Sequence, residues 1–376
     1  MDLDRERLLE RMVQLTRDLV LIESTDARPE ERARCFQLIR NHLEQGPGVR
    51  LVRHENRSYE SLVVVPEGVD RPEVLFCGHL DVVEHSQPDS YRSELRDGRI
   101  HGPGAGDMKG QLAILVELFK QLQRERPGLP IGLAITSDEE RGGESGVRFL
   151  VEEAGLDCGA AVIPDGGSLT DVTIEEKGIL HLRIRAEGES AHAARPWLGR
   201  NPVDALLGAL SALKADFDAR VPPGFEPADQ TSHWFPTLAV TILETPNDSP
   251  NRIPDMAEAV VDVRFPPPDT VDSMFVRILG SLPPGVTVDP IVTAEPTHLS
   301  PDPRFIEITG EVAGEEARVV RACGGSDARF FCARGIPVML SRPLVGNLHG
   351  RDEWIEIESM LAYFEICRRY TRARLG

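Results

Sequence analysis

Short apolar runs separated by helical patterns fill the first half of the chain. The runs at 73–79 and 131–136 are apolar at almost every position, and the segment 110–125 between them repeats apolar residues at helical spacing. Strands that are buried on both faces and alternate with amphipathic helices are typical of a parallel sheet covered on both sides. The pattern therefore predicts an α/β domain.

After about residue 177 the pattern changes. The segment 179–188 alternates apolar and polar residues at period two, as expected for a strand with one buried face. Helical and strand patterns then follow at 201–216, 237–244, 257–265, 269–282 and 286–292. The resulting βαββαβ order predicts a ferredoxin-like domain, in which an antiparallel sheet carries its helices on one face.

From about residue 304 the chain returns to helices and one apolar run, which we expect to complete the first sheet. The predicted fold is therefore an α/β main domain with a mostly parallel sheet and an inserted ferredoxin-like domain. The main domain is expected to comprise residues 1–177 and 290–376, and the inserted domain residues 178–289.

The charge of the chain argues against several classes of partner. It carries 61 Asp and Glu against 42 Lys and Arg, a formal net charge of −19, and so acidic a surface repels nucleic acid and anionic membranes. No run approaches the roughly 18 apolar residues of a membrane span, and the first 20 residues have the pattern of an amphipathic helix, not of a signal peptide. Six cysteines without a paired spacing are typical of reduced thiols. We therefore expect a cytoplasmic protein.

Acidic residues and histidines gather where the predicted strands end. His79 and Asp81 follow one strand, and because they are two residues apart they project from the same face, where Asp81 can orient His79. Asp138, Glu139 and Glu140 follow another strand, and three adjacent acids repel one another unless they are solvated or bind a cation.

Each of these segments also has an ordinary explanation, as a capping histidine or an exposed acidic turn. Asp107, Asp165 and His349, however, lie in further loops near predicted strand ends. Ligands of open parallel sheets gather at the carboxyl ends of the strands, so the coincidence of these segments favours one shared site.

Eight motifs, in their order along the chain, resemble metallopeptidase family M20, which includes acetylornithine deacetylase, succinyl-diaminopimelate desuccinylase, aminoacylase and carboxypeptidase G. The motifs are GHLDVV, GPGAGDMKG, TSDEERGG, SAHAARPWLGRNP, SPNRIPD, VDVRF, GGSDARFF and NLHGRDEW. The resemblance covers almost the whole chain. It implies that the inserted domain is a lid that also joins two subunits into a homodimer.

The resemblance implies a site for two divalent metal ions. Asp107 would bridge both ions, His79 and Asp165 would complete the protein ligands of one, and Glu140 and His349 those of the other. Three carboxylates and two imidazoles without a thiolate suit zinc, with cobalt or manganese as alternatives, better than magnesium. The small residues around Asp107 are expected to let backbone and cations approach its carboxylate.

The resemblance also implies catalytic residues. Glu139 would act as general base: it would take a proton from a metal-bridged water, whose hydroxide attacks an amide carbonyl, and pass it to the leaving amine. Asp81 would orient His79. His192 would reach the partner subunit's site and stabilise the oxyanion, the alternative being a histidine that fixes a lid loop.

Substrate-binding residues follow from the same motifs. Asn251 and Arg264 would bind the carboxylate of the substrate, a task that suits a guanidinium fork, although a surface salt bridge is the alternative for Arg264. The loop of Gly324, Gly325 and Ser326 resembles the backbone-rich segment that holds the other end of the substrate.

We therefore expect a two-metal amidohydrolase that hydrolyses the amide bond of a small N-acyl amino acid, a substrate with a carboxylate. One departure from the family keeps an alternative open. Asp165 stands where deacylases and carboxypeptidases of the family usually carry Glu, and where aminopeptidase-type members usually carry Asp. A dipeptidase or small-peptide exopeptidase is the first alternative, and a catalytically silent amino-acid-binding protein the second.

Overall fold

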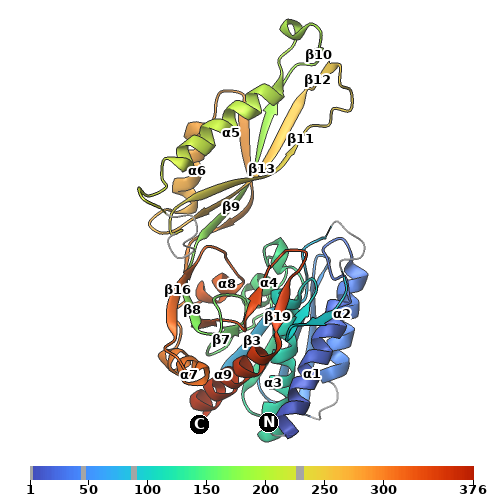
Figure 1. Ribbon diagram of the computed structural model, residues 1–376, viewed down its shortest axis with the longest axis vertical. Coiled ribbons are helices and arrows are strands. Elements are labelled where there is room, and N and C mark those ends of the chain that lie inside the picture. The colour runs from blue at the N-terminus through green and yellow to red at the C-terminus, as the bar shows by residue number, and fades with distance from the viewer. Residues whose placement is uncertain (1–2, 44–47, 86–90, 226–232) are drawn as a thin grey trace. The chain divides into compact units, whose positions relative to one another are not determined.

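The computed structural model of the protein describes residues 3–43, 48–85, 91–225 and 233–376 (Figure 1). The chain divides into two compact units. Unit 1 comprises residues 1–174, 298–320 and 326–376, and unit 2 comprises residues 175–297 and 321–325. The sequence analysis gave the inserted domain as residues 178–289, whereas residues 175–177, 290–297 and 321–325 also belong to unit 2.

A nine-stranded sheet forms the centre of unit 1. Its strand order is β1-β2-β6-β3-β7-β17-β8-β15, and β16 pairs with β8. The four central strands β6, β3, β7 and β17 are parallel, which confirms the mostly parallel sheet, whereas β1, β2 and β8 pair antiparallel. The strands are β1 (Val49–Asn56), β2 (Tyr59–Pro66), β3 (Val74–His79), β6 (Ile131–Thr136), β7 (Ala161–Ile163), β8 (Asp171–Glu176), β15 (Thr297–His298), β16 (Arg318–Ala322) and β17 (Val338–Leu340).

Helices cover both faces of this sheet. One apolar core joins α1, α2, α3, α7 and α9 to one face, and a second core joins α4 and α8 to the other. β3 is buried along its whole length because its side chains enter both cores, with Phe76 in the first and Leu75 in the second. The helices are α1 (Leu3–Val20), α2 (Pro29–Leu43), α3 (Gly110–Glu125), α4 (Val147–Glu152), α7 (Pro303–Ala313), α8 (Ala328–Cys332) and α9 (Ile357–Leu375).

Unit 2 contains the βαββαβ fold that its sequence pattern predicts. Its antiparallel sheet has the order β11-β13-β9-β14, and α5 and α6 pack on one face in a single apolar core. The Asn201 side chain caps α5 by accepting a hydrogen bond from Val203 N at 3.1 Å. The elements are β9 (Gly178–Glu187), α5 (Pro202–Asp218), β11 (Thr237–Glu244), β13 (Met256–Phe265), α6 (Val271–Ser281) and β14 (Val286–Ala294).

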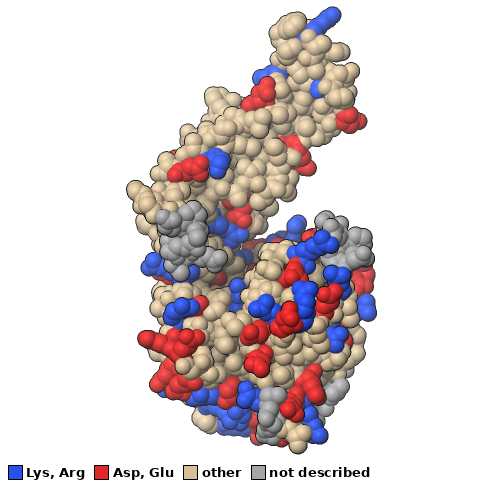
Figure 2. Space-filling view, viewed as in Figure 1, with Lys and Arg blue, Asp and Glu red and all other residues tan. Residues whose placement is uncertain are grey.

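Two small sheets complete the described structure. β18 (Val345–Gly346), β19 (Trp354–Glu356), β5 (Arg99–His101) and β4 (Glu94–Arg96) form one in unit 1, and β10 (Ala191–His192) pairs with β12 (Arg252–Ile253) in unit 2. The six cysteines are unpaired, and no helix in the described ranges is both long and apolar enough to span a bilayer. On the face shown in Figure 2, charged side chains crowd unit 1 and are sparser on unit 2.

Candidate metal centre

The carboxyl ends of three central parallel strands carry three of the five predicted metal ligands, and two further loops carry the others. His79 is the last residue of β3, Asp165 comes two residues after β7, and Glu140 lies in the turn that follows β6. Asp107 lies in the turn before α3, and His349 follows β18. All five belong to unit 1, so a single compact unit brings them together.

These side chains form two adjacent groups. In each group, one potential ligand atom of every member lies within 4.8 Å of the others; His79, Glu139 and Asp165 form the first group, and Asp107, Glu140 and His349 the second. The first group contains Glu139, which the sequence analysis assigned to proton transfer. The geometry therefore leaves Glu139 near enough to a cation site to act on its ligands or on a water beside them.

Asp107 lies between the two groups and presents one oxygen to each. Its Oδ1 is 3.2 Å from His79 Nε2, and its Oδ2 is 3.2 Å from His349 Nε2, which is also 3.2 Å from Glu140 Oε1. The Asp107 side chain is 11% exposed. A carboxylate that faces one imidazole nitrogen with each oxygen has the arrangement of a bridging ligand.

The donor set fits metal ions. His79 Nδ1 lies 3.1 Å from the carbonyl oxygen of Asp81, which can accept its hydrogen bond, so Nε2 is the ring atom that faces Asp107 and that would bind a metal ion. His79 Nε2 and Glu140 Oε1 are buried, and neither has a hydrogen-bond partner within the described part of the chain. Buried polar atoms without partners are rare in folded proteins, and divalent cations would satisfy both of these.

Charge at the centre is unbalanced in a way that cations would correct. Burial acts to raise the pKa of Asp107, but His349 and His79 hold that pKa well below its usual range. The same contact with Asp107, together with Glu140, raises the pKa of His349 to about 11. Burial raises the pKa of Asp165 and Glu139, and the nearby carboxylates add to this effect. Without cations, bound protons offset the negative charge of these carboxylates, and bound cations would replace those protons.

Asp81 ties the end of β3 to the turn after β6. Its Oδ1 lies 3.5 Å from His79 Nδ1, and its Oδ2 accepts a hydrogen bond from Glu140 N at 3.0 Å. The contact from Asp81 to His79 thus runs mainly through the Asp81 carbonyl, while the carboxylate fixes the backbone of a second predicted ligand.

Three supporting residues were missed by the sequence analysis as site residues. Glu353 is 1% exposed, and its Oε1 accepts hydrogen bonds from Gly106 N at 2.7 Å and from Asp107 N at 2.8 Å. Asp138 accepts from Ser145 N at 2.7 Å and so holds the turn of Glu139 and Glu140. Both acids occur within the quoted motifs, but only the folded structure gives them partners.

The third supporting residue is Arg329 in the first turn of α8, which contacts the end of the same turn. Its guanidinium donates to the carbonyl oxygen of Gly142 at 2.6 Å and to that of Ser326 at 3.2 Å. The SDAR segment, residues 326–329, therefore helps to fix the turn that carries Glu139 and Glu140, within unit 1.

Gly106 is small for a reason that the sequence analysis did not give. A Cβ atom on Gly106 would lie 2.8 Å from the carbonyl oxygen of Trp354 and 3.0 Å from atoms of Leu348 and Val345. The glycine therefore lets the Asp107 turn pack against the segment that carries His349. Close packing of backbone, rather than access for cations, explains this position.

Two predicted residues of unit 2 lie on one short hairpin. His192 in β10 pairs with Arg252 in β12, and Ala193 N donates to the carbonyl oxygen of Asn251 at 2.8 Å. His192 is exposed, and its Nδ1 accepts a hydrogen bond from Ala194 N at 3.1 Å. In the neutral ring the proton is therefore on Nε2.

Arg264 lies near the end of β13, whereas the hairpin of β10 and β12 precedes the start of that strand in the chain. Its Nε and NH2 donate to the carboxylate of Asp262 at 2.7 and 3.0 Å, and His181 lies beside both. The nine residues from Met256 to Arg264 span about 26 Å in an extended strand. Asn251 comes before the start of this strand, whereas Arg264 lies near its end.

The glycine loop spans the boundary between the units. Gly324 and Gly325 belong to unit 2 and Ser326 to unit 1. Gly325 packs on Ile179, whose side chain would lie 2.8 Å from an added Cβ, and Ser326 is 1% exposed. A backbone-rich loop is present, and the side chain of Ser326 is turned inward.

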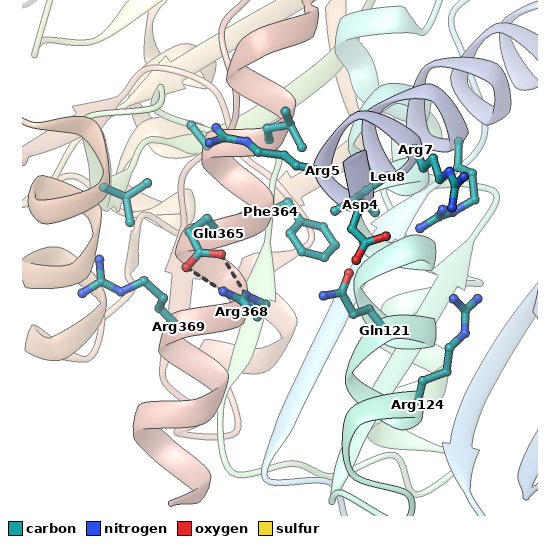
Figure 3. A pocket seen from close by; sticks show the side chains of 14 residues that line it. Asp4, Arg5, Arg7, Leu8, Gln121, Arg124, Phe364, Glu365, Arg368 and Arg369 are labelled. Atoms are coloured by element: carbon teal, nitrogen blue, oxygen red, sulfur yellow. Dashed lines mark hydrogen bonds and ion pairs between the residues drawn. The ribbon is translucent and has the colours of Figure 1, made fainter. Parts of the chain in front are cut away.

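A cleft of about 860 Å³ lies elsewhere, between α1, α3 and α9 (Figure 3). Arg7 and Arg124 lie on one side of it, and Arg368 and Arg369 on the other. It contains none of the residues of the two metal-ligand groups. The size of a cleft therefore does not mark the candidate site in this molecule.

Comparison with known proteins identifies similar chains. The sequence profile described as peptidase family M20/M25/M40 matches residues 75–373. A succinyl-diaminopimelate desuccinylase of Gluconacetobacter diazotrophicus is 30% identical over 332 residues, which are 82% of this chain and 83% of the relative.

Solved structures share the fold at lower identity. Human carnosine dipeptidase 1 is 16% identical with a TM-score of 0.76, covering 99% of this chain and 98% of its own. An M20 family metallo-carboxypeptidase from Sulfolobus solfataricus is 17% identical with a TM-score of 0.75, covering 100% and 99% of the two chains. The α/β architecture with a second, antiparallel unit is therefore shared with these enzymes.

Proposed function

Because this chain belongs to peptidase family M20/M25/M40 and is a hydrolase of amide or peptide bonds, we propose that it removes the acyl group from a small N-acyl amino acid. Membership in the family sets aside the catalytically silent binder. The observation that carries the proposal is the position of Asp107, with one oxygen 3.2 Å from His79 Nε2 and the other 3.2 Å from His349 Nε2.

Two divalent cations are the proposed cofactors. His79 and Asp165 would hold one, Glu140 and His349 the other, and Asp107 both. Imidazole and carboxylate donors suit zinc, with cobalt or manganese as alternatives. When bound, the cations would polarise the amide carbonyl and lower the pKa of a water molecule.

Proton transfer is assigned to Glu139. Its carboxylate lies 3.8 Å from His79 Nε2, and burial raises its pKa, which suits a group that must both accept and return a proton. Glu139 would take the proton of the attacking water while the C–O bond forms, and would give it to the amine nitrogen as the C–N bond breaks. Asp81 keeps the His79 ring oriented through its carbonyl oxygen and holds Glu140 N through its carboxylate.

Oxyanion stabilisation is assigned to His192. Because Nδ1 accepts from Ala194 N, the Nε2–H of the neutral ring is available as a donor. Asn251 lies on the same hairpin, so both side chains would act together on one substrate.

The distance between Asn251 and Arg264 supports a homodimer. The family resemblance implies that both residues bind one substrate. In a homodimer, Arg264 of one subunit would hold the carboxylate of the substrate, and Asn251 on the hairpin of the other subunit would contact the same molecule. The edge strand β11 offers a pairing surface, because its Val240, Ile242 and Leu243 are 44%, 50% and 56% exposed. An unpaired apolar edge strand is a template for addition of a second chain.

A dipeptidase is the second candidate, and Asp165 is the observation that favours it. Its carboxylate is one methylene shorter than the Glu that the deacylases usually carry. The deacylase would act on a substrate whose amine is blocked by an acyl group, and the dipeptidase on a substrate with a free amine.

A substrate panel separates these candidates. Metal-loaded protein should hydrolyse N-acetyl or N-succinyl amino acids faster than unblocked dipeptides, and the reverse order would favour the dipeptidase. Glu139→Ala should keep both metal ions and lower kcat by about 10²–10⁴. Loss of an ion from this variant would reassign Glu139 as a ligand.

A further inference from the structure

The guanidinium of Arg342 places a positively charged side chain beside the metal centre. It comes two residues after the end of β17, and Asp165 comes two residues after the end of β7. The two strands are parallel neighbours, with Leu340 paired to Ile163. Arg342 and Asp165 therefore continue the same register, and Arg342 NH1 lies 4.0 Å from Asp165 Oδ1. In the described part of the chain, no other arginine or lysine forms an ion pair with a member of the two metal-ligand groups.

The guanidinium of Arg342 has donors to spare. Its side chain is 19% exposed, and its Nε is buried without a hydrogen-bond partner among the described residues. A contact of 4.0 Å is longer than a hydrogen bond, so even NH1 is not donating to Asp165. A mostly buried guanidinium with unused N–H groups is costly unless an anion or water binds it.

An anionic acyl group gains a defined position here. The centre contains Asp107, Glu139, Glu140 and Asp165, whose charges two divalent cations would offset, and the chain carries a net charge of −19. A substrate carboxylate that is not itself a metal ligand is therefore favoured where a positive side chain receives it. The Nε edge of a guanidinium receives a carboxylate with two parallel hydrogen bonds.

The spacing fits the acyl part of the substrate. The carboxylate of the amino-acid part lies equally many bonds from the amide carbonyl, but the proposed function assigns that carboxylate to Arg264, which leaves the acyl part for Arg342. Asp165, 4.0 Å from Arg342, lies within 4.8 Å of the ligand atoms of His79 and Glu139. Three C–C bonds of about 1.5 Å separate the two carboxyl carbons of a succinyl group, so its far carboxylate lies about 4–5 Å from the amide carbonyl. A succinyl chain can therefore reach from the centre toward Arg342, whereas an acetyl group cannot.

We propose that Arg342 binds the far carboxylate of a dicarboxylic acyl group, so that the enzyme favours N-succinyl over N-acetyl amino acids. This inference rests on the proposed deacylase function and assigns its acyl specificity to one residue. The alternative role, in which Arg342 only positions Asp165, predicts a different pattern of losses.

The experiment compares Arg342→Met and Arg342→Lys with wild type on the N-succinyl and N-acetyl forms of one amino acid. Arg342→Met should lose about 10- to 100-fold in kcat/KM on the succinyl substrate, the worth of one or two charge-assisted hydrogen bonds. It should keep its acetyl activity and both metal ions. Arg342→Lys, which keeps the charge but not the fork, should lie between. Arg334→Met removes an exposed guanidinium before the same strand and is the matched control.

Three results would overturn the inference: equal losses on both substrates, a missing metal ion in Arg342→Met, or a wild-type preference for the acetyl substrate. A binding measurement decides the point independently of turnover. Metal-loaded wild type should bind succinate more tightly than butyrate by calorimetry, and Arg342→Met should not distinguish them. If wild type cleaves only dipeptides, the deacylase proposal fails, and equal affinities of wild type for succinate and butyrate would separately refute the role of Arg342.

Discussion

Glu353 is predicted to hold the Asp107 turn in place. Glu353→Ala leaves Gly106 N and Asp107 N, two buried donors, without their acceptor. A hydrogen bond to a charged group contributes about 1.5–3 kcal/mol, so the free energy of unfolding should fall by up to about 3–6 kcal/mol. In a domain of this size each kcal/mol lowers Tm by about 2–4 °C, which gives a decrease of roughly 6–24 °C.

The assay is thermal unfolding of metal-free protein, followed by titration with zinc. Glu353→Gln keeps an acceptor oxygen and should lose less than Glu353→Ala. The neighbouring Asp352, whose side chain is 60% exposed and pairs with Arg96 at 2.8 Å, provides the control. Asp352→Ala should change little, because exposed ion pairs contribute little. If Glu353→Ala unfolds at the temperature of Asp352→Ala and binds zinc like wild type, Glu353 does not support Asp107.

Four further predictions follow from the two units. Removal of metal by a chelator should abolish hydrolysis, and zinc, cobalt or manganese should restore it; full activity of verified metal-free protein would contradict the metal centre. Mixing inactive His192→Ala with inactive Glu139→Ala under subunit exchange should restore part of the activity, and an active monomer in sedimentation would refute the shared site. Arg264→Lys should lower kcat/KM for substrates with a free carboxylate but leave metal content and cleavage of the matching amide unchanged, whereas wild-type behaviour would make Arg264 a surface residue. Burial acts to raise the pKa of Asp262, yet His181 and Arg264 hold that pKa well below 3.8, so its stabilising contribution is complete above that value and is lost as pH falls below it. Asp262→Asn should therefore destabilise the protein near neutral pH and flatten its acid unfolding curve, and an unchanged curve would refute this coupling.

The hydrophobic pattern predicted the central sheet and the βαββαβ unit because the positions of apolar residues along a strand show which of its faces are buried. β3 is apolar on both faces, whereas β13 alternates, and the sequence shows this difference directly. The five candidate ligands could also be identified from the sequence, because they lie near strand ends and in recognisable motifs.

Other contacts at the site form between segments that are far apart in the sequence, and no local sequence pattern predicts such contacts. Arg342 reaches Asp165 only because β17 lies beside β7 in register, and Glu353 reaches Asp107 from 246 positions away in the sequence. The family motifs imply a common task for Asn251 and Arg264, which are only thirteen positions apart, but the sequence does not show that most of β13 separates them.

The route of the chain also sets an order for its synthesis. β17 lies between β7 and β8 in the sheet, yet it is made only after the whole segment 175–297 of unit 2. While the ribosome is still translating, unit 2 can complete its fold, but the edge of β7 stays open and His349 has not yet emerged. Open strand edges in partly made chains are prone to association. Nascent chains that stop before residue 338 should therefore need chaperones, and His349, the last of the candidate metal ligands along the chain, becomes available only after β17 has been made.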